Sequence, residues 1–177
     1  SVVKGQNVKA GDMLGQVGIS GKTQFPHVHL SVRKGNLVID PFSPKGRLSC
    51  DPKPQDTLWD DLPIYEPGGL ISVGFSDSVP EFDDVKAGIL VPDNITTASP
   101  ALVLYAQAFG TRTGDIIRFQ IEGPNGVIHE DQAEMPRNQA MVMRASGRKS
   151  KRRTWNTGTY RGTVELLRRG TVIETML

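Results

Sequence analysis

Short alternating strands separated by turn residues fill the second half of the sequence, and this pattern limits the fold more than any other feature. From about residue 85 onward, turn signals such as Gly123-Pro124-Asn125-Gly126 and Arg169-Gly170 recur every eight to twelve residues. Apolar and polar residues alternate between these turns, as they do in half-buried strands. The sequence therefore predicts an all-β fold, with a β-sandwich over residues 85–177. The expected strands are residues 101–109, 115–122, 127–130, 139–143, 158–168 and 171–175.

An aromatic pattern near the end of the sequence narrows the kind of sandwich. Trp155 is followed by Gly158-Thr159-Tyr160 and then by a hairpin turn at Arg169-Gly170. A Trp, a Gly-Thr-Tyr strand and a hairpin in this order resemble the end of immunoglobulin-like modules. We therefore expect the C-terminal domain to be an immunoglobulin-like sandwich.

Two histidines stand close together in the first part of the sequence. Residues 26–32 alternate strictly between apolar and polar side chains, which predicts a strand with His27 and His29 on one face. Side chains at positions i and i+2 of a strand are near enough for both imidazoles to reach one metal ion or one substrate. Gly35-Asn36 then predicts a two-residue turn into a second strand, Leu37–Ile39.

Charge divides the chain into three zones. Residues 1–50 carry seven Lys and Arg against two acidic residues, residues 51–84 carry one against nine, and residues 85–177 carry thirteen against eight. Six prolines fall within residues 41–69, so we expect residues 43–84 to form an acidic, proline-rich connector. Apolar residues would let it pack along a neighbour as an extended clasp. These residues are Trp59, Leu62, Ile64 and Tyr65.

The densest positive charge lies in residues 144–153, which contain six Lys and Arg among Gly, Ser and Ala. Seen alone, such a run would neutralise several phosphates of a nucleic acid. It has no interleaved aromatic residues, so we expect no nucleic acid partner. A solvated cationic loop is the favoured interpretation, and attraction to an anionic envelope polymer or lipid surface is the second.

Cysteine content and hydropathy exclude several classes of protein. Cys50 is the only cysteine, so an internal disulfide and a CxxC metal site are both excluded. Cys50 is either an ordinary thiol or one whose partner lies in sequence beyond this chain. No stretch approaches the roughly 20 apolar residues of a membrane helix.

The residues around the histidine pair belong to a longer pattern. Gly5-x-x-Val8-x-x-Gly11 is followed by Ser20-Gly21, then by Pro26-His27-Val28-His29-Leu30, and then by Asp40-Pro41. In this order and spacing the pattern closely resembles the C-terminal half of lysostaphin-type zinc metallopeptidases, which are peptidoglycan endopeptidases. The resemblance covers residues 1–42, about a quarter of the chain.

The resemblance implies roles for both histidines. His29 corresponds to a zinc ligand of the family. His27 corresponds to an active-site histidine that orients or deprotonates the zinc-bound water and stabilises the tetrahedral intermediate. Zinc would lower the pKa of that water and polarise the scissile carbonyl. The implied activity is hydrolysis of peptide bonds of peptidoglycan, in the periplasm or outside the cell.

The departures from the family concern the rest of the zinc site. A catalytic zinc takes three protein ligands, and the family supplies the other two from an upstream His-x-x-x-Asp motif that this sequence lacks. A further catalytic histidine of the family would fall before Ser1. We therefore expect residues 1–42 to be the tail of a larger domain, inactive alone, with open strand edges that favour a homodimer. Phe25 and Leu30-Ser31 are smaller departures that would alter the groove or strand pairing.

Three other interpretations concern the chain and its zinc site. A catalytically dead relative would act as a cell-wall binding or regulatory module, and the upstream sequence would distinguish it. A lipoyl or biotinyl carrier shares the glycine turns, but its modified lysine has only Lys22 as a candidate, in unlike surroundings. His129 could in principle complete the zinc site, but its spacing favours an ordinary histidine of a surface hairpin.

Overall fold

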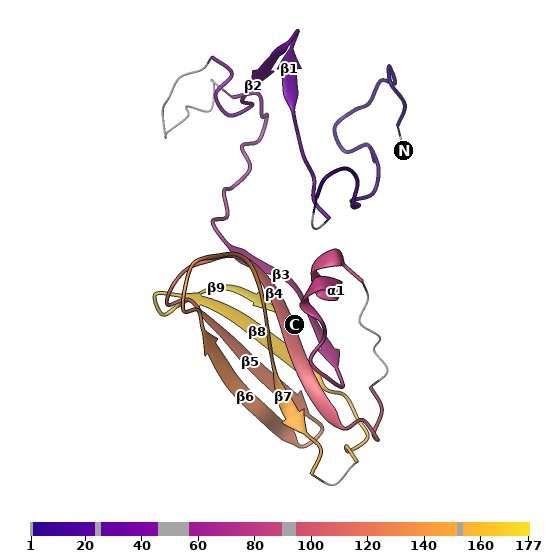
Figure 1. The fold of residues 1–177 in the computed structure, drawn as a ribbon, viewed down its shortest axis with the longest axis vertical. Coiled ribbons are helices and arrows are strands. Elements are labelled where there is room, and N and C mark those ends of the chain that lie inside the picture. The colour runs from indigo at the N-terminus through magenta and orange to yellow at the C-terminus, as the bar shows by residue number, and fades with distance from the viewer. Residues whose placement is uncertain (1, 24–25, 46–56, 90–94, 152–153) are drawn as a thin grey trace. The chain divides into compact units, whose positions relative to one another are not determined.

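The computed structural model describes residues 2–23, 26–45, 57–89, 95–151 and 154–177. The chain divides into two compact units, Ser1–Tyr65 and Glu66–Leu177 (Figure 1). Nine strands and one six-residue helix account for the regular structure of the described residues, which confirms the predicted all-β class. No helix in this part of the chain is long and apolar enough to cross a membrane.

The first unit contains one hairpin among its described residues. Strands β1 (Val32–Lys34) and β2 (Leu37–Ile39) pair antiparallel, with Lys34 opposite Leu37. Gly35 takes a φ of 59° in the turn between them, a conformation that glycine adopts without strain. The predicted turn and the predicted strand at residues 37–39 are therefore confirmed.

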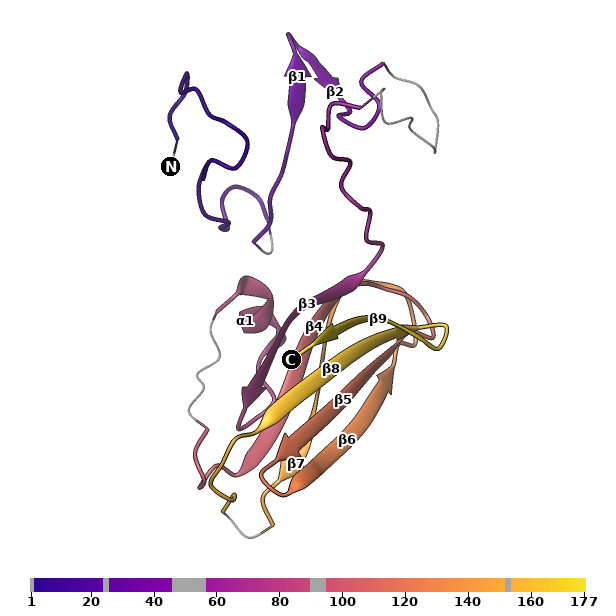
Figure 2. The same ribbon diagram turned by 180° about the vertical axis from the view of Figure 1, so that it is seen from behind.

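The second unit is a sandwich of two antiparallel sheets (Figures 1 and 2). The three-stranded sheet has the order β3 (Gly69–Ser76), β4 (Ala101–Thr111) and β7 (Gln139–Lys149). The four-stranded sheet has the order β6 (Gly126–Glu134), β5 (Ile116–Gly123), β8 (Arg161–Arg168) and β9 (Thr171–Met176). Consecutive strands β4 and β5 lie in different sheets, as they do for the second and third strands of an immunoglobulin-like sandwich. The last two strands of the second unit, β8 and β9, pair with each other, as the last two strands of that fold do.

The core lies between the two sheets and follows from the two-residue period of the strands. Alternate residues of β5, namely Ile117, Phe119 and Ile121, are fully buried, and Leu104 and Ala106 of β4 are buried with them. Trp155 and Tyr160 are partly buried and pack against this cluster. The described residues of the first unit contain no buried side chain, so the buried core belongs to the second unit.

The second unit begins earlier in the chain than the expected boundary at residue 85. Strand β3 pairs with β4 along most of its length, and Leu70 is buried in the core. The side chain of Glu174 in β9 accepts a hydrogen bond of 2.5 Å from the backbone NH of Leu70, which links β3 to the other sheet. Helix α1 (Phe82–Ala87) follows, with Val85 buried. Residues 69–87 were expected to belong mostly to the connector, but their apolar side chains instead complete the sandwich.

The basic run is also different from the expectation. Residues 144–149 are the second half of β7 and pair with β4, for example Ser146 with Leu104 and Arg148 with Leu102. The prediction of a loop was wrong there. Gly147 allows this pairing, because a Cβ at that position would collide with the carbonyl oxygen of Leu102. Strand β6 likewise continues to Glu134, beyond the predicted end at residue 130.

A buried ion pair lies where the two sheets meet. Arg168 of β8 donates to the Asp115 carboxylate at 2.7 Å through Nη2, and the same group donates to the carbonyl oxygen of Gly110 at 3.0 Å. Burial raises the pKa of Asp115, but hydrogen bonds from Arg168 and from the backbone of Arg112 outweigh it and leave that pKa below its ordinary value. Asp115 is therefore ionised and fully paired at neutral pH.

Candidate functional site

The histidine pair lies just before the hairpin of the first unit. His27 and His29 belong to residues 26–31, which form no regular structure, and β1 begins only at Val32. The strand predicted over residues 26–32 is therefore wrong except at its last residue. An isolated extended segment lacks the hydrogen-bonded ladder of a strand, and no strand of the described residues pairs with it.

Both imidazoles are exposed. The Oγ1 of Thr23 lies 3.1 Å from Nδ1 of His27 and is a hydrogen-bond partner that restrains the rotation of this ring. The apolar neighbours Val28 and Leu30 are 79% and 58% exposed. Their exposure leaves the segment with an uncovered apolar face, which is the condition that the expected dimer requires. The dimer itself remains a prediction.

The donors of the described residues do not make a complete zinc site. His27 and His29 supply two imidazoles at most, whereas a catalytic zinc takes three protein ligands. No group of three or more His, Cys, Asp or Glu in the described part of the chain is arranged to hold a metal ion. A zinc bound at His29 would need donors that these residues do not provide.

The third histidine has a different setting. His129 lies in β6 of the β5–β6 hairpin, in agreement with the predicted hairpin, but it is half-buried rather than at the surface. Its Nε2 lies 2.8 Å from the Oγ of Ser146 in β7. Ser146 also donates a hydrogen bond of 2.5 Å to Asp131. This bond is the main reason that the pKa of Asp131 lies below its ordinary value. His129 thus helps to join the edge strands β6 and β7. Cys50, the single cysteine of the sequence, lies outside the described residues.

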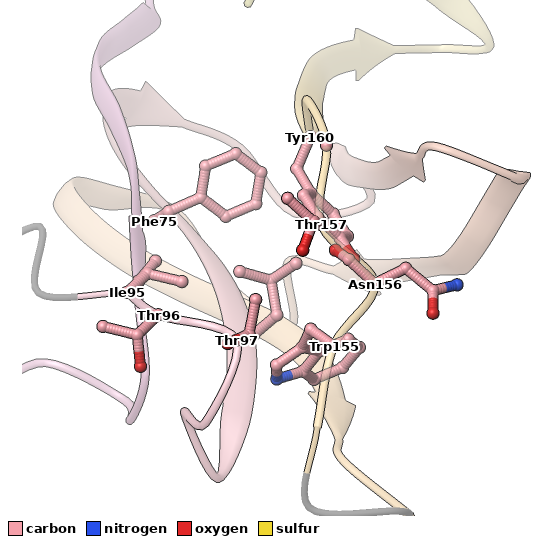
Figure 3. A pocket seen from close by; sticks show the side chains of 10 residues that line it. Phe75, Ile95, Thr96, Thr97, Trp155, Asn156, Thr157 and Tyr160 are labelled. Carbon is pink, nitrogen blue, oxygen red and sulfur yellow. The ribbon is translucent and has the colours of Figure 1, made fainter.

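Two adjacent cavities lie at one end of the sandwich. The first has a volume of about 370 Å³ and a mainly apolar wall, and Figure 3 shows Phe75, Trp155 and Tyr160 around it. The second has a volume of about 350 Å³ and is lined by Arg148, Lys149 and Lys151. Trp155, Asn156 and Tyr160 line both cavities.

The sequence does not predict a site at these cavities. The pattern around Trp155 and Tyr160 predicts a fold and not a ligand site. The composition of the cationic run predicts a loop, because Gly147 and the neighbouring Ser and Lys residues are typical of loops. One sequence signal does point to the cavities: Trp155 and Tyr160 follow the basic run within a few residues.

Comparison of the sequence with family models and curated proteins, and of the structure with solved structures, finds no match.

Proposed function

We propose that this chain is part of a zinc-dependent endopeptidase that hydrolyses peptide bonds of peptidoglycan, with His29 as a metal ligand and His27 as an active-site histidine. The observation that carries the proposal is the run Pro26-His27-Val28-His29 in register with the glycine turns before it and Asp40-Pro41 after it. The setting would be the periplasm or the cell exterior, where this substrate is found.

The backbone of the first unit supports the proposal at the glycine turns. Gly5, Gly11 and Gly21 take φ values of 90°, 90° and 76°. A side chain is strained in this region, so the glycines of the motif stand where the backbone requires them. Both imidazoles are exposed and therefore accessible to an ion or a substrate.

The remaining donors would come from residues that this sequence does not contain. When bound, zinc supplies an activated water and polarises a carbonyl. The contact between Thr23 and Nδ1 of His27 orients the imidazole, which is the contribution that this chain makes to positioning. The sandwich would hold the peptidase unit near the wall.

Zinc binding by the chain tests His29 directly. We expect weak binding, and well below one zinc per chain after dialysis, because two imidazoles make an incomplete site. His29→Ala should abolish the weak binding measured by competition with a chromogenic chelator. His129→Ala is the matched control and should leave it unchanged. Tight stoichiometric zinc in the unmodified chain would contradict the incomplete site, and unchanged binding in His29→Ala would remove His29 from it.

Activity has to be measured in a longer protein that carries the His-x-x-x-Asp motif together with this chain. There, His29→Ala should eliminate release of soluble fragments from purified peptidoglycan. His27→Ala should reduce the rate by about 10²-fold or more, because a proton-transfer group typically contributes that much. Full activity in His29→Ala would refute the assigned role.

A second candidate is a cell-wall binding or regulatory module without catalysis. It is favoured by the absence of a third metal donor among the described residues. Such a module would sediment with purified peptidoglycan and release nothing from it, even in the longer protein with zinc present. The peptidase would release peptide fragments under the same conditions.

A further inference from the structure

The two cavities at the end of the sandwich share part of their wall and differ in chemistry. Trp155, Asn156 and Tyr160 separate them and contribute to both. On one side the wall is carbon-rich, and on the other it is cationic. A ligand that fits both sides needs an apolar face and a negative charge within a short distance of each other.

The aromatic rings of the first cavity are fixed before any ligand arrives. Trp155 donates from Nε1 to the carbonyl oxygen of Ser99 at 2.8 Å, and Tyr160 donates its hydroxyl to the carbonyl oxygen of Asn156 at 2.9 Å. The two rings meet edge to face with centroids 6.4 Å apart. Because their polar atoms are already bonded within the protein, the rings offer mainly carbon to a ligand. Rings held in this way cost little entropy on binding.

Neutral polar side chains surround this apolar wall. Thr97, Asn156 and Thr157 line the first cavity, and within the described part of the chain their side chains make no hydrogen bond. Among the described residues, no Asp, Glu, Lys or Arg lines this cavity. Hydroxyl and amide groups beside an apolar wall suit a ring with a carbon face and hydroxyl edges, which is the chemistry of a pyranose.

The second cavity adds uncompensated positive charge. Arg148, Lys149 and Lys151 line it, and no acidic side chain from the described part of the chain does. Arg148 donates to the carbonyl oxygen of Ile128 at 3.0 Å, which fixes its guanidinium. Lys149 and Lys151 make no ion pair with any carboxylate that the structure describes. This side would attract carboxylate or phosphate groups.

We propose that this surface binds an anionic glycan, with a sugar ring against Trp155 and Tyr160 and its acidic group against Lys149 and Lys151. The shared chemistry is an acidic pyranose, whether the acid is a uronic carboxylate or a phosphodiester between sugars. Single-stranded nucleic acid also combines rings with charge, but the three uncommitted hydroxyl and amide side chains favour a ligand rich in hydroxyls. The proposal does not depend on the peptidase function, because the surface lies wholly within the second unit.

Binding by the full chain to four probes tests the proposal by calorimetry. The probes are an oligogalacturonate, a sugar-phosphate oligomer, a neutral malto-oligosaccharide of equal ring number and a single-stranded oligothymidylate of equal charge. We expect one or both acidic glycans to bind at least about tenfold more tightly than the neutral one, and binding to weaken with salt because exposed charges are screened. Comparison of the first two distinguishes carboxylate from phosphate. Equal binding of the neutral glycan, tighter binding of oligothymidylate, or no binding of any probe would overturn the proposal.

Variants locate the binding surface. Lys149→Gln with Lys151→Gln should weaken binding about tenfold, because each exposed ion pair is worth up to about fivefold. Lys86→Gln with Arg137→Gln is the matched control, since it removes the same charge from the same unit outside both cavities. Asn156→Asp places a negative charge on the shared wall and should weaken binding without removing a core side chain. Equal loss in the charge control, or no loss in Asn156→Asp, would overturn the assigned site. None of these tests measures hydrolysis, so a failure here leaves the peptidase proposal untouched.

Discussion

Asp115 carries a charge inside the sandwich, where an unpaired carboxylate would be very costly. Its side chain is 2% exposed, and it accepts hydrogen bonds from the backbone NH of Arg112 at 2.8 Å and from two nitrogens of Arg168. Because Arg168 also binds the carbonyl oxygen of Gly110, one guanidinium joins β8 to the end of β4. The pair therefore fixes how the two sheets meet at this end.

Removing one partner of this pair should destabilise the sandwich strongly. We expect Arg168→Met to lower the free energy of unfolding by about 3 kcal/mol, because it leaves Asp115 buried without its counter-ion. Urea unfolding followed by tryptophan fluorescence measures this change. The pKa of Asp115 is lowered in the folded state, so the pair's stabilisation is complete above about pH 3.9 and is lost as the pH falls below that value. Arg168→Met should lose this part of the pH dependence, and an unaltered pH profile would contradict the assignment.

Gly147 shows how a single missing side chain sets the path of a strand. A Cβ there would meet the backbone of Leu102 and, at 2.7 Å, the Cα of Val103. We expect Gly147→Ala to cost about 1–3 kcal/mol in unfolding free energy, since the colliding atoms are backbone and cannot rotate away. Gly18→Ala is the control, because its Cβ would meet nothing within 4 Å, and it should change stability by less than about 0.5 kcal/mol. Equal stability of the two variants would refute the close approach.

At the scale of elements, the strands with clear alternation could be predicted and those with unusual composition could not. Strands β4, β5, β8 and β9 lie within a few residues of their predicted positions, because turn residues bound them and β5 and β8 have apolar buried side chains. Strand β3 was missed because Gly69 and Gly74 weaken its pattern, although both stand where other groups approach closely. The second half of β7 was not predicted as a strand, because its composition is polar and Ser146 bonds His129 and Asp131 of β6.

This junction between β6 and β7 should respond to a single hydroxyl. Ser146 bonds both His129 and Asp131, and its bond to Asp131 is the largest cause of the lowered pKa of that carboxyl. Ser146→Ala should therefore raise the pKa of Asp131 toward its ordinary value. Carbon-detected NMR of the side-chain carboxyl across a pH titration measures it. Gln120→Ala serves as the comparison, because Gln120 bonds Glu130 and not Asp131. An unshifted pKa in Ser146→Ala would show that the bond is absent in solution.

At the scale of the whole molecule, the two units differ in what holds them together. The second has a core of buried side chains from both sheets, whereas the described residues of the first have none. The sequence predicted the hairpin of the first unit from Gly35-Asn36, a local signal. It could not predict the absence of a strand at His27 and His29, since alternation reveals a face and not the partner that would cover it. The proposed zinc site likewise depends on which segments would pair with the histidine segment, and the sequence does not reveal them.

Limited proteolysis should distinguish the two units. We expect low concentrations of trypsin to cleave first at exposed sites such as Lys4, Lys9 and Arg33, because local opening costs little where none of the described side chains is buried. Arg161 and Arg168 lie in paired strands of the sandwich and should be cleaved late. Mass spectrometry over time gives the order. Early cleavage at Arg168, or simultaneous loss of both units, would contradict the difference in packing.

The bond between Leu70 and Glu174 has a consequence for how the chain is made. These partners are 104 residues apart in the sequence, and β3 and β9 come from the two extremes of the sandwich. During synthesis the first strand therefore leaves the ribosome long before the last one exists. The closing contacts form only after residue 174 has emerged, so the sandwich folds late and slowly, as proteins rich in distant contacts do. Until then the strand that begins the sandwich remains unprotected, and the cell must keep it from pairing elsewhere.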